Sequence, residues 1–179
     1  MTRPLAKFCA ITIAIVSLVC CTTEASHAEP LEQFPDLTRL TPVRAQELYK
    51  PLRSGSSYEF LTPSNIYCRI TLGSIGCSGD IPGIPVSTPH TTTGTDCALI
   101  AAEVGQNLNT GPYTFQRHGG NCATIDYQHT HRLNNGQKAQ LYLMQPVTVT
   151  CGVDQPARLA CKDTNNHGFV IDPAGSWTF

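Results

Sequence analysis

Six of the nine cysteines lie in the last 112 residues of this 179-residue chain, and they constrain its fold more than any other feature. The other three, Cys9, Cys20 and Cys21, lie in an apolar run near the N-terminus. Paired thiols persist in oxidising compartments outside the cytoplasm. The distribution therefore predicts an export signal followed by a small domain stapled by disulfides.

Residues 1–28 have the parts of a secretory signal peptide. Arg3 and Lys7 give a positive start, residues 8–21 are almost entirely apolar, and Ser26-His27-Ala28 has the small-x-small form of a cleavage site. An uncleaved membrane anchor is an alternative, but the apolar run is shorter than the roughly 20 residues that a spanning helix needs. We expect a secreted protein that begins at Glu29 and has no membrane span.

Lipid anchoring at Cys20 or Cys21 is a second alternative, because each cysteine follows an apolar stretch. A lipoprotein signal has a small residue directly before the lipidated cysteine, and here that place holds Val19 or Cys20. Because this match is poor, secretion remains the favoured prediction.

Composition indicates one domain with a neutral polar surface. Cleavage after Ala28 leaves 151 residues, enough to bury a core, with 10 Lys and Arg against 12 Asp and Glu. No basic stripe remains, so nucleic acid is not an expected partner. Charged residues make up 14% of the chain, below the usual quarter or so. Thr, Asn, Gly and Pro take their place, as in other extracellular β domains.

The spacing of the cysteines favours hairpin disulfides over a zinc site. Six cysteines allow 15 pairings, but the first two and the last two each flank a strand–turn–strand pattern. Antiparallel neighbours bring Cβ atoms about 4.5–5.5 Å apart, within reach of a disulfide. Thiolate zinc sites usually need cysteines two to four residues apart, and none follow Cys21. The predicted pairs, the middle one by elimination, are Cys68–Cys77, Cys97–Cys122 and Cys151–Cys161.

Residues 29–57 form a lead-in to the strand-rich part of the chain. Thr41 would cap a short helix at about 42–49, with Pro42 in its first turn and Pro51 ending it. A polar linker with one helical turn is an equal alternative.

Residues 58–179 have the texture of a mainly β fold. Short apolar runs alternate with Gly, Pro and Asn clusters, and Asn134-Asn135-Gly136 predicts a hairpin turn between 130–133 and 137–141. This favours a small disulfide-stapled sandwich or barrel, preceded by the short N-terminal helix. Residues 98–104 are ambiguous between helix and strand, and residues 82–95 predict an exposed loop.

The stretch Phe60-Leu61-Thr62-Pro63-Ser64-Asn65-Ile66-Tyr67-Cys68 is the most distinctive. It resembles the Phe-x-Ser-Pro-Ser-Gly-Asn-Ile-x-Cys opening of a family of small secreted actinobacterial cysteine-rich proteins. The family's later features match Ile75-Gly76-Cys77, Cys161, His167-Gly168-Phe169 and Phe179, although the chain lacks the glycine before Asn65. The resemblance implies a secreted domain of uncharacterised function and carries no activity.

His129-Thr130-His131 is the strongest candidate for metal binding, because alternate residues of a strand face the same side. A tetrahedral site needs further ligands, and Asp126, His118 and His167 lie at no diagnostic spacing. Histidines on a solvated hairpin are the favoured alternative. We therefore predict neither a metal nor a cofactor.

The sequence contains no catalytic signature around these residues. It has no Gly-x-Ser-x-Gly elbow, six paired cysteines leave no free thiol, and no spacing makes Asp163 and Asp172 a glycosidase pair. Single exposed aromatic residues are common, but four would suit a sugar- or peptide-binding face. They are Tyr113, Tyr127, Tyr142 and Trp177.

Three hypotheses about function follow. The favoured one is a secreted, disulfide-stabilised, non-catalytic binding or envelope-associated module with an unknown extracellular or cell-envelope ligand. The second is a secreted hydrolase or metal-binding protein centred on Asp126, His129 and His131, which requires these side chains to converge in one pocket. The third is an inhibitor of an extracellular enzyme, with residues 82–95 as its rigid loop.

Overall fold

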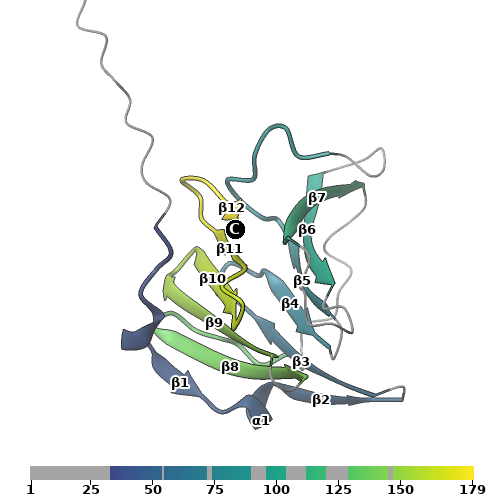
Figure 1. Ribbon diagram of the computed structural model, residues 1–179, viewed down its shortest axis with the longest axis vertical. Coiled ribbons are helices and arrows are strands. Elements are labelled where there is room, and N and C mark those ends of the chain that lie inside the picture. The colour runs from purple at the N-terminus through teal and green to yellow at the C-terminus, as the bar shows by residue number, and fades with distance from the viewer. Residues whose placement is uncertain are drawn as a thin grey trace, which may run out of the picture. The chain divides into compact units, whose positions relative to one another are not determined.

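The computed structural model describes residues 33–53, 55–71, 74–89, 96–103, 112–119, 129–144 and 147–179, and of residues 96–103, 118–119 and 143–144 the backbone alone. Within these ranges the chain forms twelve strands, one short α-helix and one turn of 3₁₀ helix (Figure 1). The helical elements are η1 (Leu37–Arg39) and α1 (Ala45–Leu48). None of the helices in this part of the chain is long and apolar enough to cross a membrane.

The strands form two sheets of six, which we call sheet A and sheet B. Sheet A has the order β1-β8-β9-β10-β11-β12. Strands β1 and β8 are parallel, and every other pair of neighbouring strands in this sheet is antiparallel. Its strands are β1 (Thr41–Val43), β8 (Gln137–Met144), β9 (Val147–Gln155), β10 (Arg158–Asp163), β11 (Gly168–Ile171) and β12 (Trp177–Thr178).

Sheet B has the order β2-β3-β4-β5-β6-β7, and all its neighbours are antiparallel. Its strands are β2 (Tyr49–Leu52), β3 (Gly55–Leu61), β4 (Tyr67–Ile70), β5 (Ser74–Gly79), β6 (Asp96–Glu103) and β7 (Thr114–Gly119).

The core lies between the two sheets, so the predicted mainly β fold is confirmed as a sandwich. Phe60 and Ile70 of sheet B belong to one buried cluster with Leu141, Val149 and Phe169 of sheet A. Strand β9 alternates between buried and half-exposed residues along its first half, as expected of a strand with one face on a core. Its outward residues are therefore available for a site.

Two disulfides staple the hairpins of this core. Cys68 lies directly opposite Cys77, and Cys151 directly opposite Cys161, with Cα atoms 4.1 Å apart in both pairs. All four residues are fully buried. These are the two pairings that the hairpin patterns predict, while the predicted Cys97–Cys122 pair lies outside the described side chains.

The helix expected at about 42–49 is shorter than predicted. Thr41 instead begins a strand, and its N–H donates to the Gly136 carbonyl at 2.9 Å beside β8. Only residues 45–48 are helical, and Tyr49 already begins β2. Pairing with strands far along the chain outweighs the weak local capping signal, so this segment supplies a strand to each sheet.

The structure decides one open prediction and corrects another. Residues 96–103 form strand β6, so the Ala-rich stretch, left open between helix and strand, is a strand. The turn at Asn134 forms, with the Gln137 N–H donating to its carbonyl at 3.0 Å, but the incoming arm does not pair with β8. Leu133 is fully buried and donates its N–H to the Leu61 carbonyl at 3.0 Å. The burial of Leu133 holds the segment before the turn against β3, and β1 pairs with β8 where that segment was expected.

The turn between β3 and β4 contains no glycine, and Asn65 takes the left-handed position in it. Asn65 adopts a φ of +60°, a left-handed conformation that asparagine tolerates better than most residues. Its N–H donates to the Thr62 carbonyl at 3.0 Å, and the Ile66 N–H donates to Thr62 Oγ1 at 3.0 Å. The turn therefore closes around Thr62.

Candidate functional site

The outer face of sheet A carries two rows of polar side chains. Residues directly opposite one another in neighbouring strands point to the same side. One row runs from Gln140 through Thr150 to Lys162, across β8, β9 and β10, and the next contains Tyr142 opposite Thr148. These side chains are partly or fully exposed. The residues that alternate with them along the strands are buried and face the core.

An N-terminal arm, residues 33–40, covers the rest of this face. Leu37 packs with the buried Ala160 and Val170, and the half-buried Phe34 and Leu40 lie against the same cluster. Gly152 makes room for the arm, because a Cβ at this position would lie 2.6 Å from Leu40 Cδ1. The arm therefore forms a wall beside the open polar rows.

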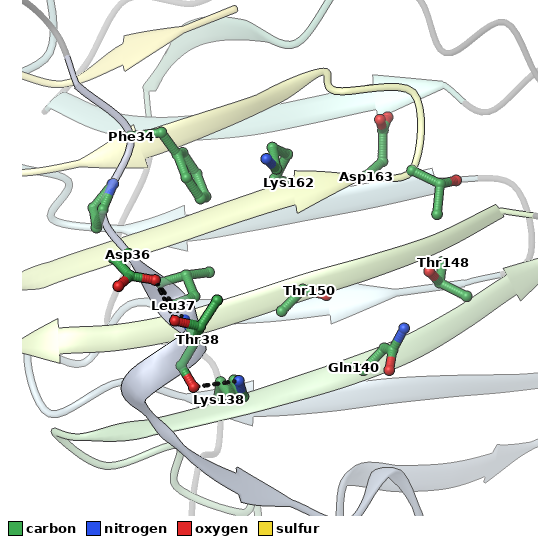
Figure 2. A pocket seen from close by; sticks show the side chains of 12 residues that line it. Phe34, Asp36, Leu37, Thr38, Lys138, Gln140, Thr148, Thr150, Lys162 and Asp163 are labelled. Atoms are coloured by element: carbon green, nitrogen blue, oxygen red, sulfur yellow. Dashed lines mark hydrogen bonds between the residues drawn. The ribbon is translucent and has the colours of Figure 1, made fainter.

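Between the arm and the polar rows lies a hollow of about 400 Å³ (Figure 2). Such a volume lies in the range of small-molecule sites, about 300–1,000 Å³. Figure 2 shows Phe34, Asp36 and Thr38 on the arm side, and Thr148 and Gln140 toward the far side with Thr150 between. The complete lining is residues 34–38 with Lys138, Gln140, Thr148, Thr150, Lys162, Asp163 and Thr164.

The cations that line the hollow already have contacts within the protein. Lys138 Nζ donates to the Thr38 carbonyl at 3.1 Å. Lys162 Nζ lies 5.1 Å from the centre of the Phe34 ring, within the range of a cation–π contact. Each ammonium group thus has one contact with the N-terminal arm.

The carboxylates are committed as well. A side-chain hydrogen bond from Thr38 holds the pKa of Asp36 below its ordinary value. Asp163 is buried, and its Oδ1 accepts the Asn165 N–H at 2.8 Å and the His167 N–H at 3.0 Å. Burial raises the pKa of Tyr113, whose hydroxyl lies 3.5 Å from Asp163 Oδ2. Asp163 therefore organises the turn after β10.

Four neutral groups remain in the hollow. The side chains of Gln140, Thr148, Thr150 and Thr164 make no hydrogen bond within the described part of the chain. Each hydroxyl offers one donor and two lone pairs, and the amide offers a carbonyl oxygen and two N–H groups. The open part of the site is thus a set of neutral groups that both donate and accept.

A second hollow, of about 420 Å³, brings together His129 and His131. It is lined by residues 47–50, Glu59 and residues 129–131, and His131 Nε2 lies 3.9 Å from Glu47 Oε2. Asp126 lies outside the described residues. Among the residues that the structure describes, no three His, Cys, Asp or Glu side chains are placed to hold one metal ion.

The other proposed ligands do not join this hollow in the described structure. His167 lies beside Asp163, with Nδ1 4.0 Å from Oδ2. The side chain of His118 is outside the described part. His129 and His131 are therefore the only two of the predicted ligands that the described structure places in one hollow.

Glu59 forms the charged floor of the second hollow, and its side chain is only 5% exposed. Ser57 Oγ donates to its Oε1 at 2.8 Å, Arg69 Nε lies 3.3 Å from Oε1, and Lys50 Nζ lies 3.0 Å from Oε2. Burial, the largest influence, raises the pKa of Glu59, but hydrogen bonds from Lys50, Ser57 and Tyr67 outweigh it and the pKa is lowered. This carboxylate is held as an anion by its own neighbours.

The aromatic and acidic candidates separate into structural and exposed groups. Tyr113 is buried against Phe169, with ring centres 5.5 Å apart, whereas Tyr142 is 58% exposed on the outer face of sheet A. Trp177 is half-buried against the cluster of Leu37, Ala160 and Val170, and Tyr127 lies outside the described residues. Asp172 accepts the Ala174 N–H at 2.8 Å and lies 3.6 Å from Arg158 Nη1. Asp172 thus orders its own turn.

The described part of the predicted loop, residues 82–89, is anchored at both ends. Ser176 Oγ donates to the Pro82 carbonyl at 2.6 Å, and the Arg117 N–H donates to the Pro89 carbonyl at 2.9 Å. Val86 is 96% exposed at the corner of a turn closed by the Thr88 N–H and the Pro85 carbonyl. An inhibitor loop that enters a cleft as a substrate does would have an extended backbone. The turn at Val86 does not have this conformation.

Comparison of the chain with protein-family models, curated proteins and solved structures found no match. The candidate site therefore rests on its own residues. The sequence alone points to Tyr142 but not to Gln140, Thr148 or Thr150. These three residues and Tyr142 alternate along two strands, as Gln140-x-Tyr142 and Thr148-x-Thr150. They come together only when the two strands pair in register.

Proposed function

We propose that the protein is a secreted, disulfide-stapled, non-catalytic binding module, and that it holds an extracellular or cell-envelope ligand in the hollow on the outer face of sheet A. The observation that carries the proposal is the set of four neutral side chains without hydrogen-bond partners in the described part of the chain. Polar groups in a hollow that leave their hydrogen bonds to water are ready to exchange them for a ligand.

Export is supported by two independent features. The first 28 residues have the pattern of a signal peptide, and the two buried disulfides are of the kind that persists in oxidising compartments. The resemblance to the secreted actinobacterial family points the same way. Lipid anchoring at Cys20 or Cys21 is the alternative, and intact-mass analysis of the exported protein distinguishes it from a chain that begins at Glu29.

Binding is favoured over catalysis because the acids and bases of this hollow are engaged in structural contacts. Asp36 and Asp163 accept hydrogen bonds from the backbone, and Lys138 and Lys162 contact the arm. A general acid or base has to reach a substrate proton. These contacts give all four side chains structural roles.

A secreted hydrolase is the second candidate function, because His129 and His131 line one hollow together with Glu47. Its proposed centre includes Asp126, and its nucleophile would come from a bound water. The inhibitor hypothesis is less well supported, since Val86 lies at the corner of a turn.

A pull-down with mature protein, residues 29–179, from culture fluid and cell-envelope extracts tests the proposal. Thr150→Tyr fills the hollow, and Thr114→Tyr places the same side chain at an exposed position of β7 in sheet B. We expect the wild type and Thr114→Tyr to retain the same component and Thr150→Tyr to lose it. Equal retention by all three proteins would contradict the assignment of the site. Turnover of an extract component that disappears in His129→Ala/His131→Ala would favour the hydrolase.

A further inference from the structure

The chemistry of the four neutral groups in the sheet A hollow restricts the class of ligand. Hydroxyl and amide groups both donate and accept hydrogen bonds, so Gln140 and the three threonines can pair with ligand groups that do the same. Lys138 and Lys162 also line the hollow, where their ammonium groups contact the Thr38 carbonyl and the Phe34 ring. The complement therefore fits a ligand whose own polar groups donate and accept at the same atom, as alcohol hydroxyls do.

The position of the hollow within the sheet argues against an extended peptide. Peptides commonly bind sheets by adding a strand to a free edge. Strands β8, β9 and β10 each have a neighbour on both sides, so their backbone groups are engaged in the ladder. Recognition on this face must come from side chains that stand perpendicular to the sheet, and these are short hydroxyls and one amide.

The spacing of the side chains suits a ring-sized ligand. Neighbouring strands lie about 4.7–4.9 Å apart, and residues i and i+2 of a strand about 6.5–7 Å apart. The backbone positions of Gln140, Thr150 and Thr148 thus have spacings comparable with those of hydroxyls around and between sugar rings. A neutral hydroxyl-rich molecule would satisfy several of them at once.

Tyr142 does not line the hollow, but it lies opposite the lining residue Thr148 and offers an apolar surface beside the hollow. It lies directly opposite Thr148, on the same face, and is 58% exposed. The face of the Phe34 ring at the other side of the hollow is taken by Lys162, so Tyr142 is the exposed ring of these polar rows. A rigid amphipathic ring of this kind gives contact area at low entropic cost, and it suits the C–H face of a sugar ring.

We propose that this hollow binds a neutral carbohydrate chain, with Gln140, Thr148 and Thr150 as hydrogen-bonding residues and Tyr142 as a stacking platform. The assignment rests on the proposed function, because it names the ligand class of the same site. Loss of one neutral hydrogen bond should weaken binding about 2- to 12-fold. Thr150→Val and Gln140→Leu should each have an effect of this size, and the double variant should weaken binding by about 4- to 140-fold if the two effects add in free energy.

The experiment is an array of neutral and acidic glycans probed with the mature protein, alongside a synthetic peptide library. Thr150→Val, Gln140→Leu and Tyr142→Ala are compared with the matched control Thr114→Val on sheet B. Circular dichroism and thermal melts of each variant establish that it is folded. We expect neutral glycans to bind, the three sheet A variants to weaken binding, and the control to leave it unchanged.

Three results would overturn the carbohydrate assignment. Binding to peptides alone would favour a different ligand class, and so would binding confined to acidic glycans that is lost with Lys138→Gln or Lys162→Gln. The third is an array on which no glycan binds, although the wild type still retains an envelope component in the pull-down and Thr150→Tyr loses it. This result would overturn the ligand class but support the location of the binding site. An empty array together with no such retention would contradict both proposals.

Discussion

The outer faces of the two sheets differ in what their polar side chains contact. On sheet B, the buried Glu59 is held by Ser57, Lys50 and Arg69 from its own and both neighbouring strands. On sheet A, Gln140 and Thr150 sit opposite each other with no hydrogen bond in the described part of the chain. Glu59 is paired within the protein, whereas Gln140 and Thr150 leave their hydrogen bonds to solvent or to a ligand.

The difference follows from the cost of burying charge. A buried carboxylate is destabilising unless other groups pair with it, so a face that contains Glu59 has to supply Lys50 and Arg69. Hydroxyl and amide groups that remain in contact with water carry no such requirement. The neutral groups of sheet A, Gln140, Thr148 and Thr150, can therefore stay open without loss of stability, which favours their part of the sheet as a binding site.

The largest expected effect is the same for both sheets. Removing Cys151–Cys161 from sheet A or Cys68–Cys77 from sheet B, as paired Cys→Ala substitutions, should each lower the free energy of unfolding by about 3 kcal/mol, because the loops they close are of nearly equal length. Urea denaturation measures both. A loss confined to one of the two pairs would show that the sheets do not depend equally on their disulfides.

Glu59→Gln is the next largest change and should affect only sheet B. The substitution removes the charge that pairs with Lys50 and Arg69 and leaves Ser57 a neutral acceptor, and we expect a loss of about 1–3 kcal/mol in the free energy of unfolding. The matched control is Glu47→Gln, whose partner Arg44 is exposed, and it should cost under about 0.5 kcal/mol. Equal effects of the two substitutions would contradict the account of sheet B.

The stability contribution of Glu59 should also depend on pH. Its pKa is lower in the folded protein than the ordinary value of 4.5. The contribution is therefore fully present above about pH 4.5 and is lost as the pH falls through the lower folded-state pKa. The difference in free energy of unfolding between wild type and Glu59→Gln should shrink on acidification. A difference that stays constant down to pH 2 would rule out this linkage.

His129→Ala/His131→Ala should have a small effect. Both side chains are exposed, and surface substitutions usually change stability within about 0.5 kcal/mol. We also expect no stoichiometric metal in protein purified without an affinity tag. Zinc at one equivalent, together with a melting temperature lowered by several degrees in the double variant, would instead place a metal site in the second hollow.

The sequence predicts the features that depend on neighbouring residues. The mainly β fold and the Cys68–Cys77 and Cys151–Cys161 pairs follow from alternation and short turns. The parallel pairing of Thr41–Val43 with β8 does not, because it joins segments almost 100 residues apart. The candidate site has the same limitation: Gln140, Thr150 and Lys162 become one row only through the register of three strands, and the arm that walls them adds a fourth segment.

The most direct test of the difference between the sheets is a titration of the ¹⁵N-labelled mature protein with soluble, neutral cell-envelope oligosaccharides, followed by two-dimensional NMR. We predict that the largest chemical-shift changes fall on the amides of Gln140, Thr148 and Thr150, and that those of Glu59 and Arg69 do not move. Changes concentrated around Glu59, His129 and His131, or no saturable change at any amide, would contradict the account.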